Sequence, residues 1–215
     1  NGIFLHKTKL ENKSFLCGVA TDSHRLSSSS LEIDPSINIE PIILPKKTIF
    51  QLISLLEQNT SSIKISNNKS KIRFEMNNGV LISKVIDGRF PDYSKVIPKG
   101  NNKILHLKLE EFKNSIERVT TVSSDRKEGL RMVISKDTVQ LSVNNPTSGE
   151  GIENINAKFN SEDLNISFNS RYLTDITSQI ENESIVLNLK DPGSPVLIND
   201  FSDKNSFHVV MPMKI

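Results

Sequence analysis

The sequence is poor in cysteine and in aromatic residues, and these shortages exclude some kinds of protein. Its 215 residues include one cysteine, Cys17, no tryptophan and two tyrosines. A single cysteine excludes an internal disulfide framework and a thiolate metal cluster, so a reducing cytosol fits the composition and we expect no metal or cofactor. With only Tyr93 and Tyr172 beside ten phenylalanines, a stacking platform for single-stranded nucleic acid is poorly supported.

Long apolar runs and an excess of one charge are also missing. No stretch approaches the ~20 apolar residues of a membrane helix, and the first residues, NGIFLHKTKL, lack the apolar core of a signal peptide. The 27 basic and 25 acidic residues give a formal net charge of +2, which is too small to hold the protein on a nucleic acid or an acidic membrane. We therefore expect a soluble, cytoplasmic protein in which any contact with DNA comes from local patches.

Apolar periodicity predicts an α+β chain. Alternating apolar residues predict half-buried strands at 62–66, 71–76, 80–86, 138–144 and 184–190, and turn signals such as Asp191-Pro192-Gly193 join them as hairpins. Helical spacing predicts helices over 46–56, 109–122 and 171–180, with Pro45 and Asn169 as start signals. The apolar faces expected of the helices are Ile49, Leu52, Ile53 and Leu56 in the first, Phe112, Ile116 and Val119 in the second, and Leu173, Ile176 and Ile180 in the third.

The chain contains an internal repeat. A shift of 124 residues places the segment IILPKK at 42–47 on ISFNSR at 166–171, and a shift of 127 places GIFL at 2–5 on GLRM at 129–132. We interpret this as two copies of one α+β unit. In the second copy a helix precedes Gly129, whereas nothing precedes Gly2, so the first copy is expected to lack its opening helix and the chain to be a fragment or a processed product.

The segment ATDSHRL at 20–26 contains the residue types of a hydrolytic site. A Ser-His-Asp site needs three side chains that converge, but neighbours in a turn point in different directions, so Asp22, Ser23 and His24 are not expected to do so. No other catalytic motif is present. The remaining interpretation from the residues alone is a polar turn in which Asp22 bonds backbone amides. An enzyme that uses His24 stays open as an alternative.

Four motifs, taken together, resemble a known family. The chain resembles the bacterial DNA polymerase III beta subunit, the sliding clamp, in four segments that occur in the same order along its whole length. These segments are ATDSHRL at 20–26, the linker DGRFPDYSKVIP at 87–98, VNNP at 143–146 and VVMPMKI at 209–215. The resemblance implies residues 1–94 as the second clamp domain without its opening helix, and 95–215 as the third. It implies antiparallel sheets outside and helices on one face.

The resemblance also implies a function. In that family two subunits form a homodimeric ring around duplex DNA, without sequence preference, and tether the replicative polymerase, the clamp loader and repair proteins. The expected protein is therefore a non-catalytic processivity factor. A ring that holds DNA by topology needs no tight phosphate contacts, which fits the small net charge. A peptide-binding or DNA-surface-binding module that forms no ring is the alternative.

Partners of the family insert a short peptide carrying Gln and bulky apolar residues into a cleft between these two domains. Met211 and Met213 are the best candidates for adaptable contacts, and alternation along the strand suggests that one of Val209 and Val210 belongs to the core. Ser23, Lys95 and Pro195 differ from the residues that are common at these positions in the family. The family commonly has glycine at position 23, so a positive φ there would strain the backbone of Ser23. The matching positions are Thr21, His24, Arg25, Leu26, Pro91, Lys95, Val96, Gly193, Pro195, Val209, Val210, Met211, Pro212 and Met213.

Two further surfaces follow from the resemblance. The exposed basic positions on DNA-facing helices would be Lys46, Lys47, Lys113, Arg118 and Arg171, although each of them also fits an ordinary solvated helix face. The half of the ring interface expected here comprises Thr121, Val122, Glu150 and Glu153. Without the first domain, the chain is expected not to close the natural ring.

Overall fold

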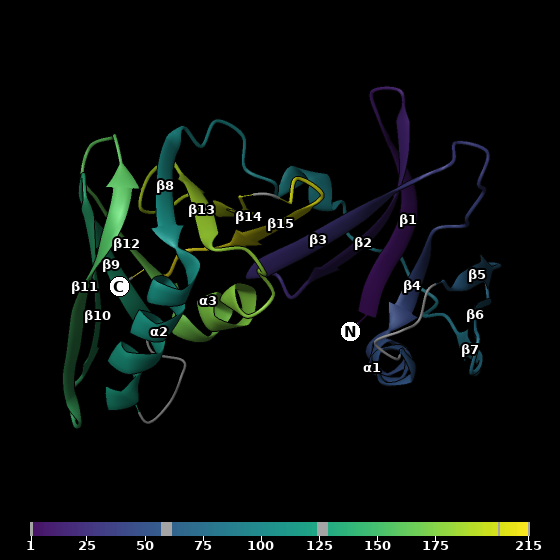
Figure 1. Ribbon diagram of the computed structural model, residues 1–215, viewed down its shortest axis with the longest axis horizontal. Coiled ribbons are helices and arrows are strands. Elements are labelled where there is room, and N and C mark those ends of the chain that lie inside the picture. Colours follow the sequence, from purple (N-terminus) through teal and green to yellow (C-terminus); the bar gives the residue numbers. More distant parts are fainter. Residues whose placement is uncertain (1, 57–61, 124–128, 202, 215) are drawn as a thin grey trace. The chain divides into compact units, whose positions relative to one another are not determined.

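The computed structural model describes residues 2–56, 62–123, 129–201 and 203–214, which form two compact units (Figure 1). The first unit comprises Asn1–Ala20 and Ser28–Asp92, and the second comprises Thr21–Ser27 and Tyr93–Ile215. The short segment Thr21–Ser27 therefore packs with the second unit, although it is flanked in sequence by the first. Within the described residues, no helix is both long enough and apolar enough to cross a membrane.

The first unit contains a four-stranded sheet, a helix and a three-stranded sheet. The four strands lie in the order β3-β2-β1-β4, and the register of β1 with β2 runs from Phe4 opposite Val19 to Leu10 opposite Lys13. The second sheet is an antiparallel meander, β5-β6-β7. The elements are β1 (Gly2–Leu10), β2 (Lys13–Thr21), β3 (Arg25–Ile33), β4 (Ile42–Pro45), α1 (Lys46–Leu55), β5 (Lys64–Asn67), β6 (Lys71–Met76) and β7 (Gly79–Lys84).

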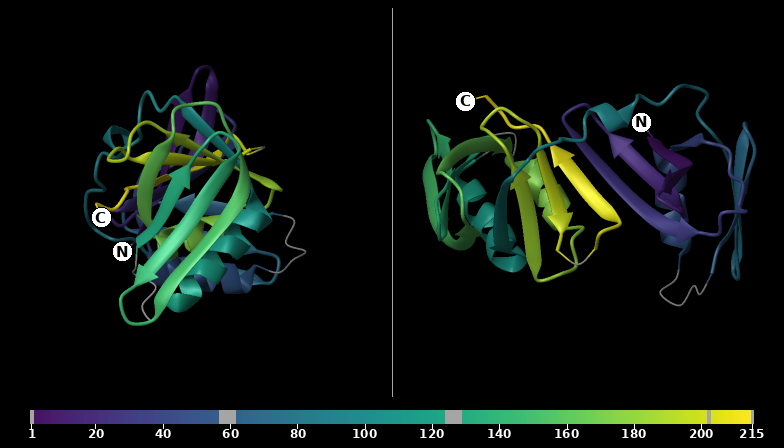
Figure 2. Two further views of the ribbon diagram at one scale, coloured as in Figure 1. Left: turned by 90° about the vertical axis from the view of Figure 1, so that its left-hand side faces the viewer. Right: turned by 90° about the horizontal axis from the view of Figure 1, so that it is seen from above.

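The second unit has eight strands in the order β12-β9-β10-β11-β8-β13-β14-β15 and two α-helices that pack against each other. Figures 1 and 2 show strands β9–β12 on one side of the helix pair and β8 with β13–β15 on another. The elements are η1 (Tyr93–Lys95), β8 (Lys103–Lys108), α2 (Leu109–Val119), η2 (Thr120–Val122), β9 (Gly129–Ile134), β10 (Thr138–Asn145), β11 (Gly149–Phe159), β12 (Leu164–Asn169), α3 (Ser170–Thr177), β13 (Ser184–Leu189), β14 (Val196–Asp200) and β15 (Ser206–Val210).

The element order confirms the duplication. The run β9-β10-β11-β12-α3-β13-β14-β15 repeats β1-β2-β3-β4-α1-β5-β6-β7, and the shift of 124 residues places the first residue of α1, Lys46, on the first residue of α3, Ser170. The predicted α+β architecture with mainly antiparallel strands is therefore confirmed. In the second unit β8 and α2 precede the repeated run, whereas the first unit, as described, starts at β1.

The helices begin close to where the sequence predicts them. Asn169 caps α3 by accepting a hydrogen bond from the Arg171 backbone N–H at 3.0 Å, as expected, and Pro45 precedes α1 in an extended conformation. The predicted helix 109–122 ends earlier as an α-helix, because Thr120–Val122 tightens into a 3-10 turn. The prediction for α3 is too long at its end, since regular helix stops at Thr177.

The predicted burial is confirmed for α2 and α3 but is half wrong for α1. Ile49 and Leu52 pack against a small core formed by Ile42, Leu44, Ile72 and Phe74, whereas Ile53 is 60% exposed and Leu56 36% exposed. The shift of 124 residues places Ile53 and Leu56 on Thr177 and Ile180, which are 1% and 7% exposed. These positions differ in exposure because α2 packs against α3, whereas no helix among the described residues of the first unit packs against α1 in the same way.

The single cysteine lies inside the first unit. Cys17 is a free thiol on β2 and is buried. Burial raises the pKa of the Cys17 thiol, and its hydrogen bond with Ser30 offsets part of that increase. A buried thiol that stays protonated is poorly nucleophilic, so we assign Cys17 a packing role.

Candidate functional site: a polar turn, a helix and the last strand

The segment Thr21–Ser27 forms a turn that its own side chains hold together. Asp22 Oδ1 accepts hydrogen bonds from the backbone N–H groups of His24 at 3.1 Å and Arg25 at 3.0 Å. Thr21 Oγ1 donates to the Arg25 carbonyl at 2.8 Å. These contacts are those of the polar turn anticipated from the sequence, in which a short acidic side chain satisfies the amides two and three residues further on.

The Asp22 carboxylate therefore binds backbone N–H groups and does not orient the imidazole ring of His24. Its other oxygen, Oδ2, accepts from Arg25 Nε at 3.0 Å. Burial alone would raise the pKa of Asp22, but the hydrogen bonds from His24 and Arg25 outweigh it and lower that pKa. The His24 ring instead lies 6.3 Å from the Tyr172 ring, centroid to centroid. This geometry does not support the alternative of an enzyme that uses His24 as a base oriented by Asp22.

Ser23, at the tip of the turn, has a positive φ of 75°. This left-handed region is unfavourable for a residue with a side chain, and glycine adopts it without that penalty. The sequence-based concern about Ser23 is thus confirmed: the backbone needs φ > 0 where this chain has serine. Such a conformation persists when the surrounding contacts fix it.

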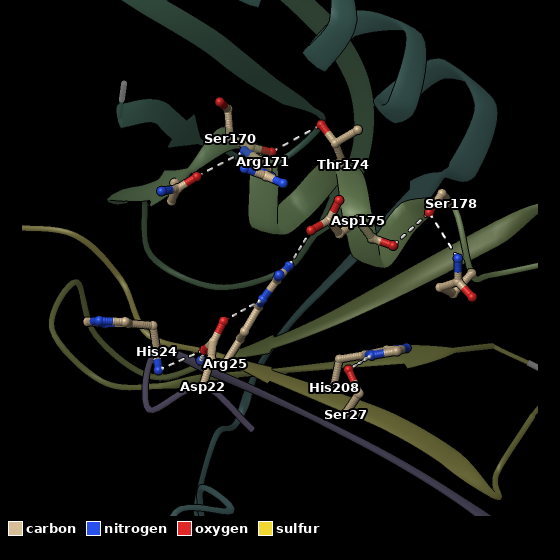
Figure 3. A network of polar contacts seen from close by, with 12 residues as sticks. Asp22, His24, Arg25, Ser27, Ser170, Arg171, Thr174, Asp175, Ser178 and His208 are labelled. Atoms are coloured by element: carbon tan, nitrogen blue, oxygen red, sulfur yellow. Dashed lines mark hydrogen bonds and ion pairs between the residues drawn. The ribbon is translucent and has the colours of Figure 1, made fainter. Parts of the chain in front are cut away.

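Arg25 joins the turn to helix α3 (Figure 3). Nη1 donates to Asp175 Oδ2 at 2.6 Å. The guanidinium carbon lies 4.4 Å from the centroid of the Tyr172 ring. Burial alone would lower the pKa of Arg25, but hydrogen bonds to Asp175 and Asp22 raise it, so the guanidinium stays charged. Sequence reasoning missed Tyr172 and Asp175; their spacing of three residues, which places both on one helix face, was the available signal.

Strand β15 and the residues after it border the same turn. The Met211 backbone N–H donates to the His24 carbonyl at 2.9 Å, and Ser27 Oγ lies 2.8 Å from His208 Nδ1. Burial lowers the pKa of His208. The second unit therefore brings together two predicted parts of the cleft, His24 and Met211, that are far apart in the sequence.

The predicted apolar residues near the C-terminus divide into buried and exposed members. Val209 and Val210 are both buried, so the expectation that one of them belongs to the core is confirmed, and the other is covered as well. Val210 belongs to the core of the second unit, and Val209 is covered on the opposite face of β15. Leu26 is buried as well. The accessible apolar surface comes from Met211, which is 39% exposed, and Met213, which is 36% exposed; Pro212 lies half-buried between them.

A second turn, between β13 and β14, lies at the same end of the sheet. Asp191 Oδ1 accepts from the backbone N–H groups of Gly193 at 2.9 Å and Ser194 at 2.8 Å. Hydrogen bonds from the Ser194 hydroxyl and these amides lower the pKa of Asp191. Pro195 immediately precedes Val196, which is paired with Val210, so Pro195 lies at the strand end next to Met211.

The remaining predicted cleft residues come from the linker. Lys95, in η1, and Val96 are exposed in the second unit. Pro91 belongs to the first unit and is exposed there. Within the part of the chain that the structure describes, no group of three or more His, Cys, Asp or Glu residues is arranged to hold a metal ion.

The predicted basic positions differ in what surrounds them. Lys46, Lys47 and Arg171 are exposed in the first turns of α1 and α3, and Lys113 is half-buried on α2. Lys46 Nζ lies 5.4 Å from the centre of the Phe50 ring. Arg118 donates through two nitrogens to the carboxylate of Glu153, so its charge is already paired within the unit.

The four predicted ring-interface residues lie on two adjacent elements, η2 and β11. Thr121 donates to the Arg118 carbonyl at 2.7 Å, and Val122 packs partly buried against the core. Glu150 is exposed, whereas the hydrogen bond from Arg118 lowers the pKa of Glu153. Gly151, between the two acids, permits the close approach of β11 to α2, because a Cβ there would lie 2.6 Å from the Val119 carbonyl oxygen.

The comparisons with known proteins extend over the whole chain. The family profile described as DNA polymerase III beta subunit, central domain, matches residues 1–92, and the profile of its C-terminal domain matches residues 94–214. The chain belongs to the DNA polymerase III beta subunit family. It is 33% identical over 216 residues to the beta sliding clamp of Caulobacter vibrioides and 30% identical over 197 residues to that of Escherichia coli K12.

These alignments cover 100% and 92% of this chain, but 58% and 54% of the relatives. The chain thus spans little more than half the length of the curated beta subunits that it matches. A crystal structure of the sliding clamp from Bartonella birtlesii bound to griselimycin matches with a TM-score of 0.95 and 36% identity, over 100% of this chain and 58% of that one. A clamp from Caulobacter crescentus matches with a TM-score of 0.94 and 33% identity, over the same shares.

Proposed function

We propose that this chain supplies two domains of a bacterial DNA sliding clamp, corresponding to residues 1–94 and 95–215. In the complete protein, two subunits would form a ring around duplex DNA and tether the replicative polymerase, the clamp loader and repair proteins. The observation that carries the proposal is the match of both beta-subunit domain profiles, in order, along the chain. The role would be non-catalytic, because it needs a ring and a docking surface but no reacting group. We propose the cytoplasm as its location.

The charge distribution supports a topological hold on DNA. The formal net charge is +2, and Arg118 is neutralised by Glu153, so Lys46, Lys47, Lys113 and Arg171 remain as the basic positions proposed to face DNA. Each neutralised phosphate adds strongly salt-dependent affinity, so a few dispersed lysines give weak, sequence-independent contacts that permit sliding. Thr121, Val122, Glu150 and Glu153 would form the second unit's part of the ring interface.

The docking surface for partners would centre on the junction of the turn with β15. Met211 and Met213 offer exposed, flexible apolar side chains that can adapt to different partner residues. The Met211 backbone N–H binds the His24 carbonyl, and the rings of His24 and Tyr172, which both have polar atoms, lie 6.3 Å apart, centroid to centroid. A short peptide carrying Gln and bulky apolar residues matches this mixture of apolar and polar groups. Within the second unit, the surface would be extended by Lys95, Val96, Gly193 and Pro195.

Fluorescence anisotropy with a fluorescein-labelled peptide of this kind tests the docking surface. We expect the folded chain to bind it and Met211→Ala to weaken affinity by about tenfold, since truncating one central anchor at an interface typically has an effect of this order. Ile104→Ala, which truncates an exposed apolar residue of β8 in the same unit, is the control and should bind like the wild type. Absence of binding by the folded wild-type chain would reject the docking surface.

A further inference from the structure

Arg25 is held by three groups of the second unit. Asp22 binds Nε and Asp175 binds Nη1 (Figure 3). The guanidinium carbon of Arg25 also lies over the Tyr172 ring, 4.4 Å from the ring centroid. The Arg25 side chain is only 27% exposed. A residue whose main task is to reach for a partner would extend into solvent. Arg25 is instead fixed in place by charge and by stacking.

The two carboxylates hold Arg25 in different ways. Asp22 belongs to the turn itself, so its pair with Arg25 closes a local loop. Asp175 lies on α3, 150 residues further along the chain, and α3 is anchored in the core by Leu173 and Ile176. The Arg25–Asp175 pair therefore ties the turn to a rigid helix, as the Met211–His24 hydrogen bond ties it to the residue that follows β15.

The turn needs such external ties because of Ser23. Its φ of 75° is unfavourable for a residue with a side chain, so the turn has an intrinsic tendency to relax to another conformation. The hydrogen bonds of Asp22 and Thr21 span at most four residues and would allow the whole turn to move as a body. Contacts with α3 and with residue 211, together with the contact of Ser27 with His208, fix its position in the unit.

We propose that Asp175 is a positioning residue of the peptide-binding surface, an inference that rests on the proposed function. By holding Arg25 Nη1, Asp175 keeps the turn in the conformation that presents His24 next to Met211. Asp175 itself does not contact the peptide in this scheme. Without it, the turn populates other conformations, and a peptide binds the fraction that remains correctly formed.

This role has a kinetic signature. The Arg25–Asp175 contact is the same in the binding-competent free protein and in the complex, so removing it lowers the competent fraction and with it the apparent association rate constant. The dissociation rate constant stays unchanged. Loss of a direct contact with the peptide gives the opposite pattern, because interface contacts act mainly on dissociation.

Stopped-flow anisotropy with the same fluorescein-labelled peptide separates these cases. For the full chain carrying Asp175→Ala we expect an association rate constant ~2–5-fold lower, the range for a partly exposed charged pair, and an unchanged dissociation rate constant. Asp175→Asn keeps an acceptor oxygen for Arg25 and should have an intermediate effect. In an Arg25→Gln background, Asp175→Ala should have no further effect, because Asp175 acts through Arg25.

Glu162→Ala is the matched control, since Glu162 is an exposed acid of the same unit that pairs with Lys103 at 3.4 Å. It should leave both rate constants unchanged. If wild type binds and Asp175→Ala alters neither rate constant, or alters dissociation alone, the positioning role is overturned while the docking surface stands. If the wild-type chain does not bind the peptide, both proposals fail. Circular dichroism checks folding, and Asp175→Asn, which conserves size, provides the test should the alanine variant unfold.

Discussion

Helices α1 and α3 occupy equivalent places in the two units but are covered differently. The shift of 124 residues places Ile49, Leu52, Ile53 and Leu56 of the first unit on Leu173, Ile176, Thr177 and Ile180 of the second. All four positions are buried in the second unit, whereas Ile53 and Leu56 are exposed in the first. The same apolar periodicity therefore gives different burial, because α2 packs against α3 and the described first unit has no matching helix.

The covering helix also changes the size of the core. In the second unit, buried residues of α2, α3 and the strands on both sides form one cluster that includes Phe112, Ile116, Phe159 and Phe168. In the first unit the cluster around α1 contains Ile42, Leu44, Ile72 and Phe74. Since hydrophobic stabilisation scales with the apolar area removed from water, equivalent substitutions should have larger effects in the second unit.

The largest expected difference is between Leu173→Ala and Ile49→Ala, which are equivalent positions. Leu173 is fully surrounded, so its truncation should leave a cavity and lower the free energy of unfolding by about 3 kcal/mol. Ile49 is partly exposed at the edge of a small core, and its truncation should lower that free energy by about 1 kcal/mol. Urea unfolding followed by circular dichroism measures both. Equal losses would mean that α1 is covered in solution as completely as α3.

The second unit also contains a half-buried histidine, His208, which should make the stability of this unit depend on pH. Burial lowers the pKa of His208 in the folded state, so the unfolded chain binds more protons as the pH falls through the ordinary histidine range. Stability contributed by neutral His208 is therefore present above about pH 6.5 and decreases as the pH falls below it. We expect the melting temperature of the second unit to be lower at pH 5.5 than at pH 7.5.

His208→Gln removes the titrating ring but keeps a polar partner for Ser27, which lies 2.8 Å from His208 Nδ1. The variant should show a smaller decrease in melting temperature between pH 7.5 and 5.5 than the wild type does. A decrease of the same size in both proteins would assign the pH dependence to other groups. Differential scanning calorimetry of both proteins at the two pH values measures these changes in melting temperature.

The sequence predicts the local structure of both units well because that structure depends on neighbours in the chain. Asn169 caps α3, hairpins form at the expected turns, and Leu173 and Ile176 are buried as the helical spacing indicates. Exposure of Ile53 could not be predicted in this way, since it depends on whether a second helix covers α1. The periodicity of one helix contains no information about its neighbour.

The candidate site could be predicted only in part, for the same reason. The family resemblance pointed to His24 and Met211, which the second unit joins by a hydrogen bond. It did not point to Asp175, because the ion pair with Arg25 links residues 150 positions apart and Asp175 lies in none of the four motifs. The burial of Val209 also escaped prediction, because strand alternation assumes that one face of β15 is open.

The smallest expected effect is that of Ile53→Gln on α1, and it tests the exposed face directly. An isoleucine that is largely exposed loses little burial when it is replaced, and glutamine is a good helix former, so the free energy of unfolding should change by less than ~0.5 kcal/mol. Ile176→Gln on α3 places a polar group in the core and should lower it by several kcal/mol. Urea unfolding at two protein concentrations compares the variants. A loss above ~1 kcal/mol for Ile53→Gln that grows with concentration would show that copies of the chain cover this face of α1 for one another, which would remove the difference between the two helices.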